Sequence, residues 1–169
     1  LITNCSNNYG NNQFPEKLIP TIIINAISGN PIPIYGSGAN VRDWLFVSDH
    51  VEALLCVLNT GKPGRTYNIG GDSEYTNLEI VLKSCEILDQ LVPSEQPYSK
   101  QIIFVEDRPG HDIRYAVDST RIQTELGWKP KVYLDEGLKF TIKWYLENKD
   151  WWGPLQKNYS VRNRLGVNK

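Results

Sequence analysis

The run Arg108-Pro109-Gly110-His111-Asp112 places a guanidinium, an imidazole and a carboxylate within five residues around a Pro-Gly pair. A Pro-Gly turn keeps such a segment out of helices and strands, so its side chains can converge on one small site. Arginine grips a phosphate group through two parallel hydrogen bonds. This run therefore predicts a site for a small anionic ligand.

Two upstream clusters contain similar side chains, and we expect both on loops: Arg42-Asp43-Trp44, and Ser6 to Gly10 followed by Phe14-Pro15-Glu16-Lys17. Lys17 is expected in the first turn of a helix, where a cation is unfavourable because the helix N-terminus is already positive. A bound anion there would be held by both the lysine and the helix end. Each cluster alone could be a surface ion pair or a pair that stabilises a turn. Three together favour one binding site.

Composition limits the classes of protein to which the chain can belong. With 169 residues, 40% hydrophobic content and a net charge of −1, we expect one globular domain and no nucleic-acid partner. No apolar run is long enough to cross a membrane, and two histidines without a Cys/His cluster predict no metal site. Three widely spaced cysteines indicate a reducing, cytoplasmic setting. Because the chain lacks methionine, a fragment, a processed product and the ordered part of a longer chain all fit.

Short strands and helices alternate along the sequence, which predicts an α/β or α+β fold. Pro15 is expected to open the first helix, Ser48 or Asp49 to cap the second, and Asp135 to cap the last. From Trp151 onward the pattern gives way to a basic tail. We expect strands over 1–5, 33–35, 44–47, 66–69 and 101–105, and helices over 15–28, 51–59, 76–91, 119–127 and from 135.

Three apparent catalytic motifs have simpler structural explanations. Gly36-x-Gly38 lacks a third glycine and precedes a strand, whereas a dinucleotide-binding loop leads into a helix. The run Ser48-Asp49-His50 has the residue types of a hydrolase triad, but neighbours in sequence rarely converge, and a helix cap explains them. Tyr145-x-x-x-Lys149 matches the tyrosine-lysine pair of short-chain dehydrogenases, but it falls at a helix C-terminus.

The ordered set of motifs closely resembles the dTDP-glucose 4,6-dehydratases, which are extended short-chain dehydrogenase/reductases. The resemblance covers about residues 1–150 and leaves 151–169 as a basic tail. It rests on residues 6–10, 14–20, 33–38, 42–44, 49–50, 67–71 and 108–112.

This resemblance implies that the chain is the C-terminal, substrate-binding region of such an enzyme and begins at a late strand of the Rossmann sheet. The glycine-rich NAD loop, the catalytic Tyr-x-x-x-Lys and the acid/base pair of the family belong upstream, so no catalytic residue is expected here. The family oxidises the sugar at C4 with NAD, removes water across C5 and C6, and returns the hydride to C6. A dTDP-sugar substrate, an N-terminal Rossmann domain and a homodimer are the implied partners.

Position by position, the resemblance also implies ligand contacts. Asn8 would touch the cofactor, and Tyr159 is a weak further candidate for a substrate contact. The alternatives are another nucleotide-sugar epimerase or decarboxylase, or a non-catalytic nucleotide-sugar-binding remnant. The implied substrate contacts are Asn7, Lys17, Leu18, Pro33, Tyr35, Arg42, Asn77, Arg108 and His111.

Two segments are expected to need a partner that the chain itself does not supply. Residues 1–5 form a predicted strand with no obvious partner in the chain, and such a strand has unpaired backbone groups. The helix over 18–27 has more isoleucines than one buried face requires. We expect a Rossmann domain to cover both, and the isolated chain to fold poorly.

Overall fold

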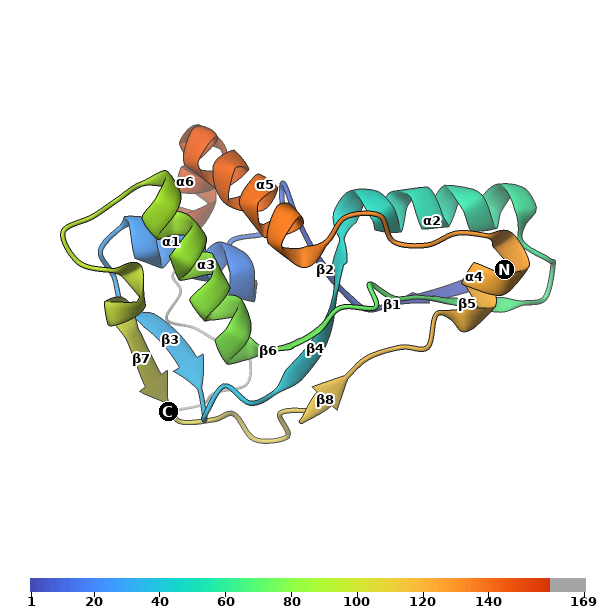
Figure 1. Cartoon of the computed structure of the whole chain (residues 1–169), viewed down its shortest axis with the longest axis horizontal. Coiled ribbons are helices and arrows are strands. Elements are labelled where there is room, and N and C mark those ends of the chain that lie inside the picture. The colour runs from blue at the N-terminus through green and yellow to red at the C-terminus, as the bar shows by residue number, and fades with distance from the viewer. Residues whose placement is uncertain (159–169) are drawn as a thin grey trace.

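The computed structural model describes residues 1–158, which form a larger and a smaller lobe joined by strand β4, Val41–Phe46 (Figure 1). The strand pairs are mostly parallel and helices lie against them, as an α/β fold requires. The predicted fold class is therefore confirmed. The larger lobe contains α1 (Leu18–Ile27), β3 (Ile32–Tyr35), α3 (Asn77–Leu91), a 3-10 helix (Tyr98–Gln101), β7 (Ile102–Val105), α5 (Leu134–Glu147) and α6 (Lys149–Asn158).

The smaller lobe is built on a two-stranded parallel sheet. It contains β1 (Ile2–Cys5), α2 (Val47–Thr60), β5 (Thr66–Ile69) and α4 (Thr120–Leu126). Three short strands pair with β4 between the lobes: β2 (Asn7–Tyr9) and β8 (Arg114–Tyr115) in parallel, and β6 (Glu74–Thr76) antiparallel.

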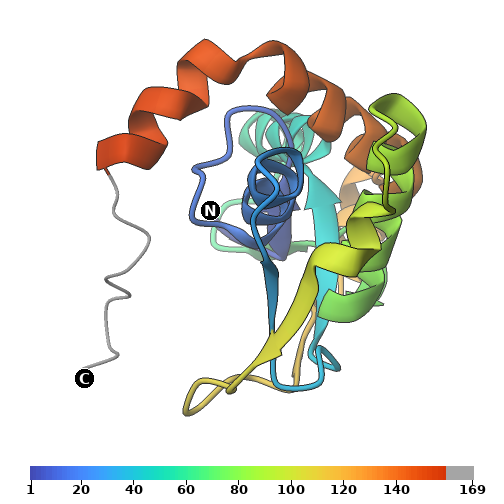
Figure 2. The ribbon, with the colours of Figure 1, turned by 90° about the vertical axis from the view of Figure 1, so that its left-hand side faces the viewer.

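Helix α1 lies at the centre of the larger lobe, beneath the arch of α5 and α6 (Figure 2). Its residues Ile19, Ile22, Ile23 and Ile24 are at most 2% exposed, and the helix contacts α3, α5 and β3. A helix that is apolar on several sides is one that is buried on several sides. The expectation that a missing domain covers α1 is therefore wrong.

Strand β1 has a partner within the chain, contrary to the sequence prediction. It pairs with β5 from Ile2↔Thr66 to Cys5↔Ile69. Helix α2 packs one face on this sheet through Ala53 and Val57. Its opposite face has an apolar stripe that is 40–72% exposed, formed by Val51, Leu54, Leu55 and Leu58.

The predicted starts of three helices are wrong. Helix α1 begins at Leu18, and Lys17, rather than a first-turn residue, is its N-cap. Helix α2 begins at Val47, and the buried Asp49 carboxylate accepts two backbone N–H groups of the loop before α5 instead of capping its own helix. Asp135 lies within the first turn of α5, which begins at Leu134.

Two local capping signals are confirmed. The Thr76 hydroxyl accepts the Glu79 N–H at 3.2 Å, while the Glu79 carboxylate accepts the Thr76 N–H at 2.7 Å, which is a complete capping box. Gly127 ends α4 in the left-handed conformation with φ 70°.

The prediction of a basic tail without regular structure from Trp151 onward is wrong for residues 151–158. Helix α6 continues to Asn158, and Trp152 is 7% exposed in the larger-lobe core. The Trp152 Nε1–H donates to the Tyr145 carbonyl at 2.8 Å. The remainder of the predicted basic tail, including Tyr159, lies outside the described residues.

Candidate functional site

Arg42 fastens the loop that follows β7 to strand β4. Its Nη2 donates to the Asp112 carbonyl at 2.9 Å, and its Nη1 donates to the Val41 carbonyl at 2.7 Å. The Asn40 amide donates to the same Asp112 oxygen at 3.1 Å. The expectation that Arg42 lies on a loop is wrong, because pairing with β6 and β8 draws this segment into a strand where Arg42 is 8% exposed. Two of its five N–H donors are thus engaged with the backbone.

The Arg108 run forms a turn, as predicted, with Gly110 at φ 69°. The Asp107 carboxylate organises it by accepting the Arg108 backbone N–H at 2.8 Å and by contacting His111 Nδ1 at 2.7 Å. The hydrogen bond from His111 is the main cause that lowers the pKa of the Asp107 carboxyl. The Arg108 side chain remains exposed to solvent.

Three further predicted residues lie on elements that adjoin this loop. Strand β3 pairs with β7 so that Pro33 is opposite Ile103 and Tyr35 is opposite Val105, immediately before the loop. Asn77 begins α3, and its backbone N–H donates to the Asn40 carbonyl at 3.0 Å. Six predicted residues therefore lie at the edge of the larger lobe where β3, β4 and the start of α3 meet the loop after β7. They are Pro33, Tyr35, Arg42, Asn77, Arg108 and His111.

Asn7 and Asn8 were expected on a loop but lie in strand β2, because this segment pairs with β4, and through β4 they adjoin this edge. Asn7 is opposite Trp44, which is two residues, or about 7 Å, along the strand from Arg42. The Asn8 Oδ1 atom lies 2.8 Å from His50 Nδ1. The sequence interpretation missed this contact because 42 residues separate the pair and no local spacing signals it.

The contacts that Lys17 and Leu18 make do not involve the Arg108 loop. Lys17 forms an ion pair with Glu16 at 3.1 Å, and its side chain is 58% exposed. Leu18 packs against the larger-lobe core. The Lys17–Glu16 pair also partly offsets the unfavourable position of a cation at the start of a helix.

The Tyr145-x-x-x-Lys149 pair is divided between two helices, because Tyr145 lies near the end of α5 and Lys149 begins α6. Tyr145 is fully buried and its hydroxyl donates to the Gln13 carbonyl. Burial raises the pKa of Tyr145, whereas a catalytic tyrosine of the short-chain dehydrogenases requires a lowered one. Residues 1–158 contain no group of three or more potential metal ligands. No helix among these residues is long and apolar enough to cross a bilayer.

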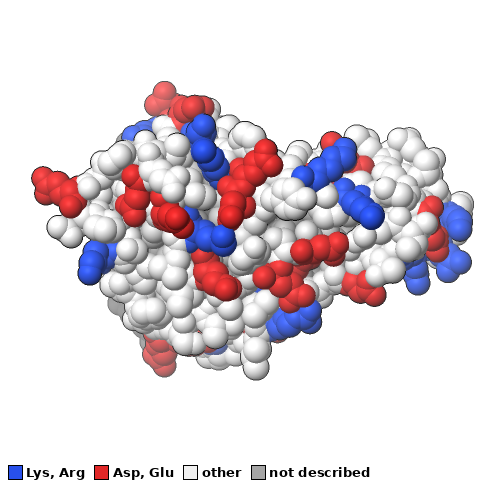
Figure 3. Space-filling model, in the orientation of Figure 1, with Lys and Arg blue, Asp and Glu red and all other residues white. Residues whose placement is uncertain are grey.

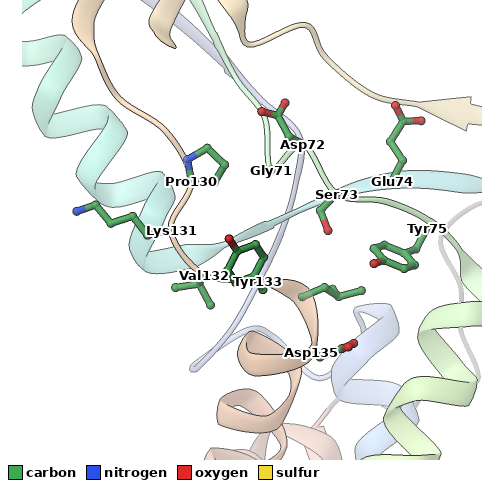
Figure 4. A pocket seen from close by; sticks show the side chains of 11 residues that line it. Gly71, Asp72, Ser73, Glu74, Tyr75, Pro130, Lys131, Val132, Tyr133 and Asp135 are labelled. Atoms are coloured by element: carbon green, nitrogen blue, oxygen red, sulfur yellow. The ribbon is translucent and has the colours of Figure 1, made fainter.

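A pocket of about 610 Å³ lies next to strand β4, and its lining residue Tyr75 is the strand partner of Arg42 (Figure 4). It opens between residues 71–75 and 130–135, and no predicted ligand contact lines it. Acidic and basic side chains are interspersed on the visible face of the molecule (Figure 3). Three of the four charged residues that line the pocket form the ion pairs Lys131–Glu52, Glu74–Arg114 and Asp135–Lys83. The carboxylate of the fourth, Asp72, accepts hydrogen bonds from Ser119 and Gln123.

Comparisons with known proteins agree with the sequence resemblance. A sequence model described as GDP-mannose 4,6 dehydratase matches residues 1–141. A "Probable dTDP-glucose 4,6-dehydratase" of Sinorhizobium fredii is 50% identical over 167 residues, which cover 99% of this chain and 48% of the relative. The chain thus spans about half the length of the curated relatives it matches.

Solved structures share the fold. The dTDP-glucose 4,6-dehydratase of Streptomyces venezuelae, with NAD and TYD bound, has a TM-score of 0.82 and 44% identity, covering 91% of this chain and 46% of that one. A UDP-glucose 4-epimerase of Thermotoga maritima, with UDP-glucose, has a TM-score of 0.74 and 26% identity, covering 86% of this chain and 45% of that one.

Proposed function

The chain belongs to the family described as GDP-mannose 4,6 dehydratase, and from this membership we propose that it is the substrate-binding part of a dTDP-glucose 4,6-dehydratase. It matches the C-terminal part of full-length relatives that bear this name. Identity of 50% to a dehydratase, against 26% to a UDP-glucose 4-epimerase, favours the dehydratase over the epimerase alternative.

The observation that carries the proposal is the bond from Arg42 to the Asp112 carbonyl. It fixes the Arg108 loop beside β4, so that the Arg42 and Arg108 guanidinium groups, from distant parts of the sequence, would border one surface. Two guanidinium groups suit a diphosphate, which has several acceptor oxygens and a double negative charge. Arg108 would meet the phosphates from the exposed side, while Arg42 would hold the loop and offer its remaining donors.

The other residues would orient the two ends of the nucleotide-sugar. Pro33 and Tyr35 would contact the thymine and deoxyribose, while Asn77 and His111 would join the arginines at the ribose and diphosphate. Asn7, Lys17 and Leu18 would line the sugar side, which requires the α1 N-terminus to face the bound sugar. Holding the sugar in one orientation is how this region would contribute to the reaction.

NAD is the implied cofactor, and the described residues fit one contact with it. Asn8 follows the carboxyl end of β1, where parallel α/β sheets bind ligands. NAD supplies the hydride acceptor and donor when bound. The groups that move protons, and the glycine-rich loop, would come from an N-terminal Rossmann domain, and the product would be a 4-keto-6-deoxy sugar for deoxysugar biosynthesis.

The smaller lobe is where we place that domain. Leu1 and Ile2 are 52% and 61% exposed, and β1 has a described partner on one side, β5. The apolar stripe of α2 adds to this surface, and exposed apolar patches mark interaction sites. A homodimer in the cytoplasm is part of the same proposal.

Substitution of Arg108 tests the diphosphate site. In the full-length enzyme, Arg108→Ala should weaken dTDP-glucose binding by about 1.5–3 kcal/mol, the scale of hydrogen bonds to a charged group. Arg108→Lys should restore only part of this loss because the fork geometry is gone. The exposed Lys143 on α5 is the matched control, and Lys143→Ala should leave the dissociation constant unchanged. Unchanged KM and kcat in both Arg108 variants would remove Arg108 from the site.

A further inference from the structure

His50 and Asn8 form a contact between the first turns of α2 and the short strand β2. The imidazole Nδ1 atom of His50 and the amide Oδ1 atom of Asn8 lie 2.8 Å apart. The orientation of the Asn8 amide is fixed by its other end, because Nδ2 donates to the Ser6 carbonyl at 3.1 Å and to Cys5 Sγ at 3.4 Å. Oδ1 is therefore the atom that faces the imidazole.

This orientation determines where the imidazole holds its proton. An amide oxygen can only accept a hydrogen bond, so His50 Nδ1 must be the donor. Partial burial lowers the pKa of His50, so the ring is neutral near pH 7 and its Nε2 is unprotonated. The structure thus specifies the Nδ1–H tautomer.

The contact stands at the carboxyl end of the parallel strands of the smaller lobe. The Ser6 N–H donates to the Ile69 carbonyl at 3.0 Å, which continues the ladder between β1 and β5 up to Ser6, two residues before Asn8. The Gln13 side chain donates to the Asn8 carbonyl at 2.7 Å. Both the amide and the carbonyl of Asn8 are therefore held before any ligand binds, which reduces the cost of ordering them on binding.

We propose that His50 is a positioning residue for the cofactor, which acts by holding the Asn8 side chain in the one orientation that meets the dinucleotide. The proposal rests on the proposed function, since it takes Asn8 as a cofactor contact. His50 touches Asn8 and would not itself touch the reacting atoms. Its neighbour Asp49 anchors a different segment, the loop before α5, so the two adjacent residues have separable roles.

The test compares three variants of the full-length enzyme by titration with NAD. His50→Leu removes the donor and should raise the dissociation constant for NAD about three- to tenfold, the range of one neutral hydrogen bond. His50→Asn can present an N–H near the position of Nδ1 and should recover most of the affinity. Ser48→Ala changes an exposed residue in the same turn and is the control. Binding of dTDP and the melting temperature should remain close to those of the parent in all three.

The results separate the inference from the proposed function. If Asn8→Ala weakens NAD binding and His50→Leu does not, the inference is overturned and the function stands. If neither variant changes NAD affinity, the inference falls together with the assignment of Asn8. A protein that binds NAD with the predicted pattern but does not turn over dTDP-glucose would overturn the function and support the inference. Nitrogen-15 NMR of the full-length enzyme should find the Nδ1–H tautomer of His50, and the Nε2–H tautomer would contradict the inference.

Discussion

The larger and smaller lobes differ in how completely they bury their apolar side chains. Nineteen buried residues form the cluster in the larger lobe, whereas seven form the cluster in the smaller one. The helices and strands of the larger lobe expose four large apolar side chains against these nineteen: Leu82, Ile103, Phe104 and Phe140. The smaller lobe exposes six against its seven: Leu1, Ile2, Val51, Leu54, Leu55 and Leu58. Because buried apolar area is the main favourable term in folding, the larger lobe supplies most of the stability, and the smaller lobe retains a surface suited to another domain.

The two lobes also divide the proposed ligand contacts. The residues assigned to the nucleotide-sugar border the larger lobe, where β3, β4 and α3 meet the Arg108 loop. The contact assigned to NAD, Asn8, follows β1 of the smaller lobe and is held by α2. On the proposed function, the larger lobe would orient the substrate, and the smaller lobe would meet the domain that supplies most of the cofactor site.

The largest expected effect comes from the larger-lobe core. Ile23 is fully buried, and Ile23→Ala should lower the free energy of unfolding by about 2–5 kcal/mol. Leu58 in the smaller lobe is 72% exposed. Leu58→Ala should therefore change the free energy of unfolding by less than about 0.5 kcal/mol. Denaturant unfolding of the 169-residue chain measures both. Equal losses of unfolding free energy in the two variants would mean that the larger lobe does not supply most of the stability.

A smaller effect is expected where the smaller lobe is fastened to the loop before α5. The Asp49 carboxylate accepts the N–H groups of Lys131 and Val132, each at 2.9 Å through the same oxygen. Asp49→Ala would leave both donors unpaired and should cost about 2 kcal/mol of unfolding free energy.

Asp49→Asn retains one carbonyl oxygen and is the matched control. It should cost clearly less than Asp49→Ala in the same denaturation experiment. Equal destabilisation by the two variants would show that charge, rather than hydrogen-bond acceptance, is what Asp49 contributes.

The smallest effect concerns acid titration of the ligand loop. The hydrogen bond from His111 lowers the pKa of Asp107 below its ordinary value of 3.8, so this contact is fully present above about pH 4 and is lost as the pH falls through the lowered pKa. NMR titration should find the Asp107 midpoint moved upward in His111→Ala. Asp118, whose pKa is lowered by Thr120, should titrate unchanged in that variant. A rise in both midpoints would mean that the substitution perturbs the fold.

Local signals in the sequence predicted local structure correctly. The Thr76–Glu79 capping box and the end of α4 at Gly127 were both recognisable, because each depends on residues within one turn of the helix. The turn at Gly110 was predicted for the same reason.

Features set by distant residues were not predicted. Arg42 is in a strand because β6 and β8 pair with it from far along the chain, and Asp49 accepts from a loop more than 80 residues away. The sequence of α1 indicated burial on several sides, but it could not distinguish a missing domain from α3 and α5. For the ligand residues, the family motifs predicted which side chains matter, and the structure adds that Arg42 is engaged with the loop it was expected to assist.

The decisive measurement is turnover of dTDP-glucose by the full-length enzyme, compared with the purified 169-residue chain supplied with NAD. The proposal predicts that the full-length enzyme forms the 4-keto-6-deoxy sugar, prefers dTDP-glucose to UDP-glucose, and loses affinity for it in Arg108→Ala. On this proposal the isolated chain should form no product, because it would contribute the substrate site while the groups that move protons would come from the N-terminal domain. Product from the isolated chain, or a full-length enzyme that epimerises UDP-glucose instead, would contradict the proposal.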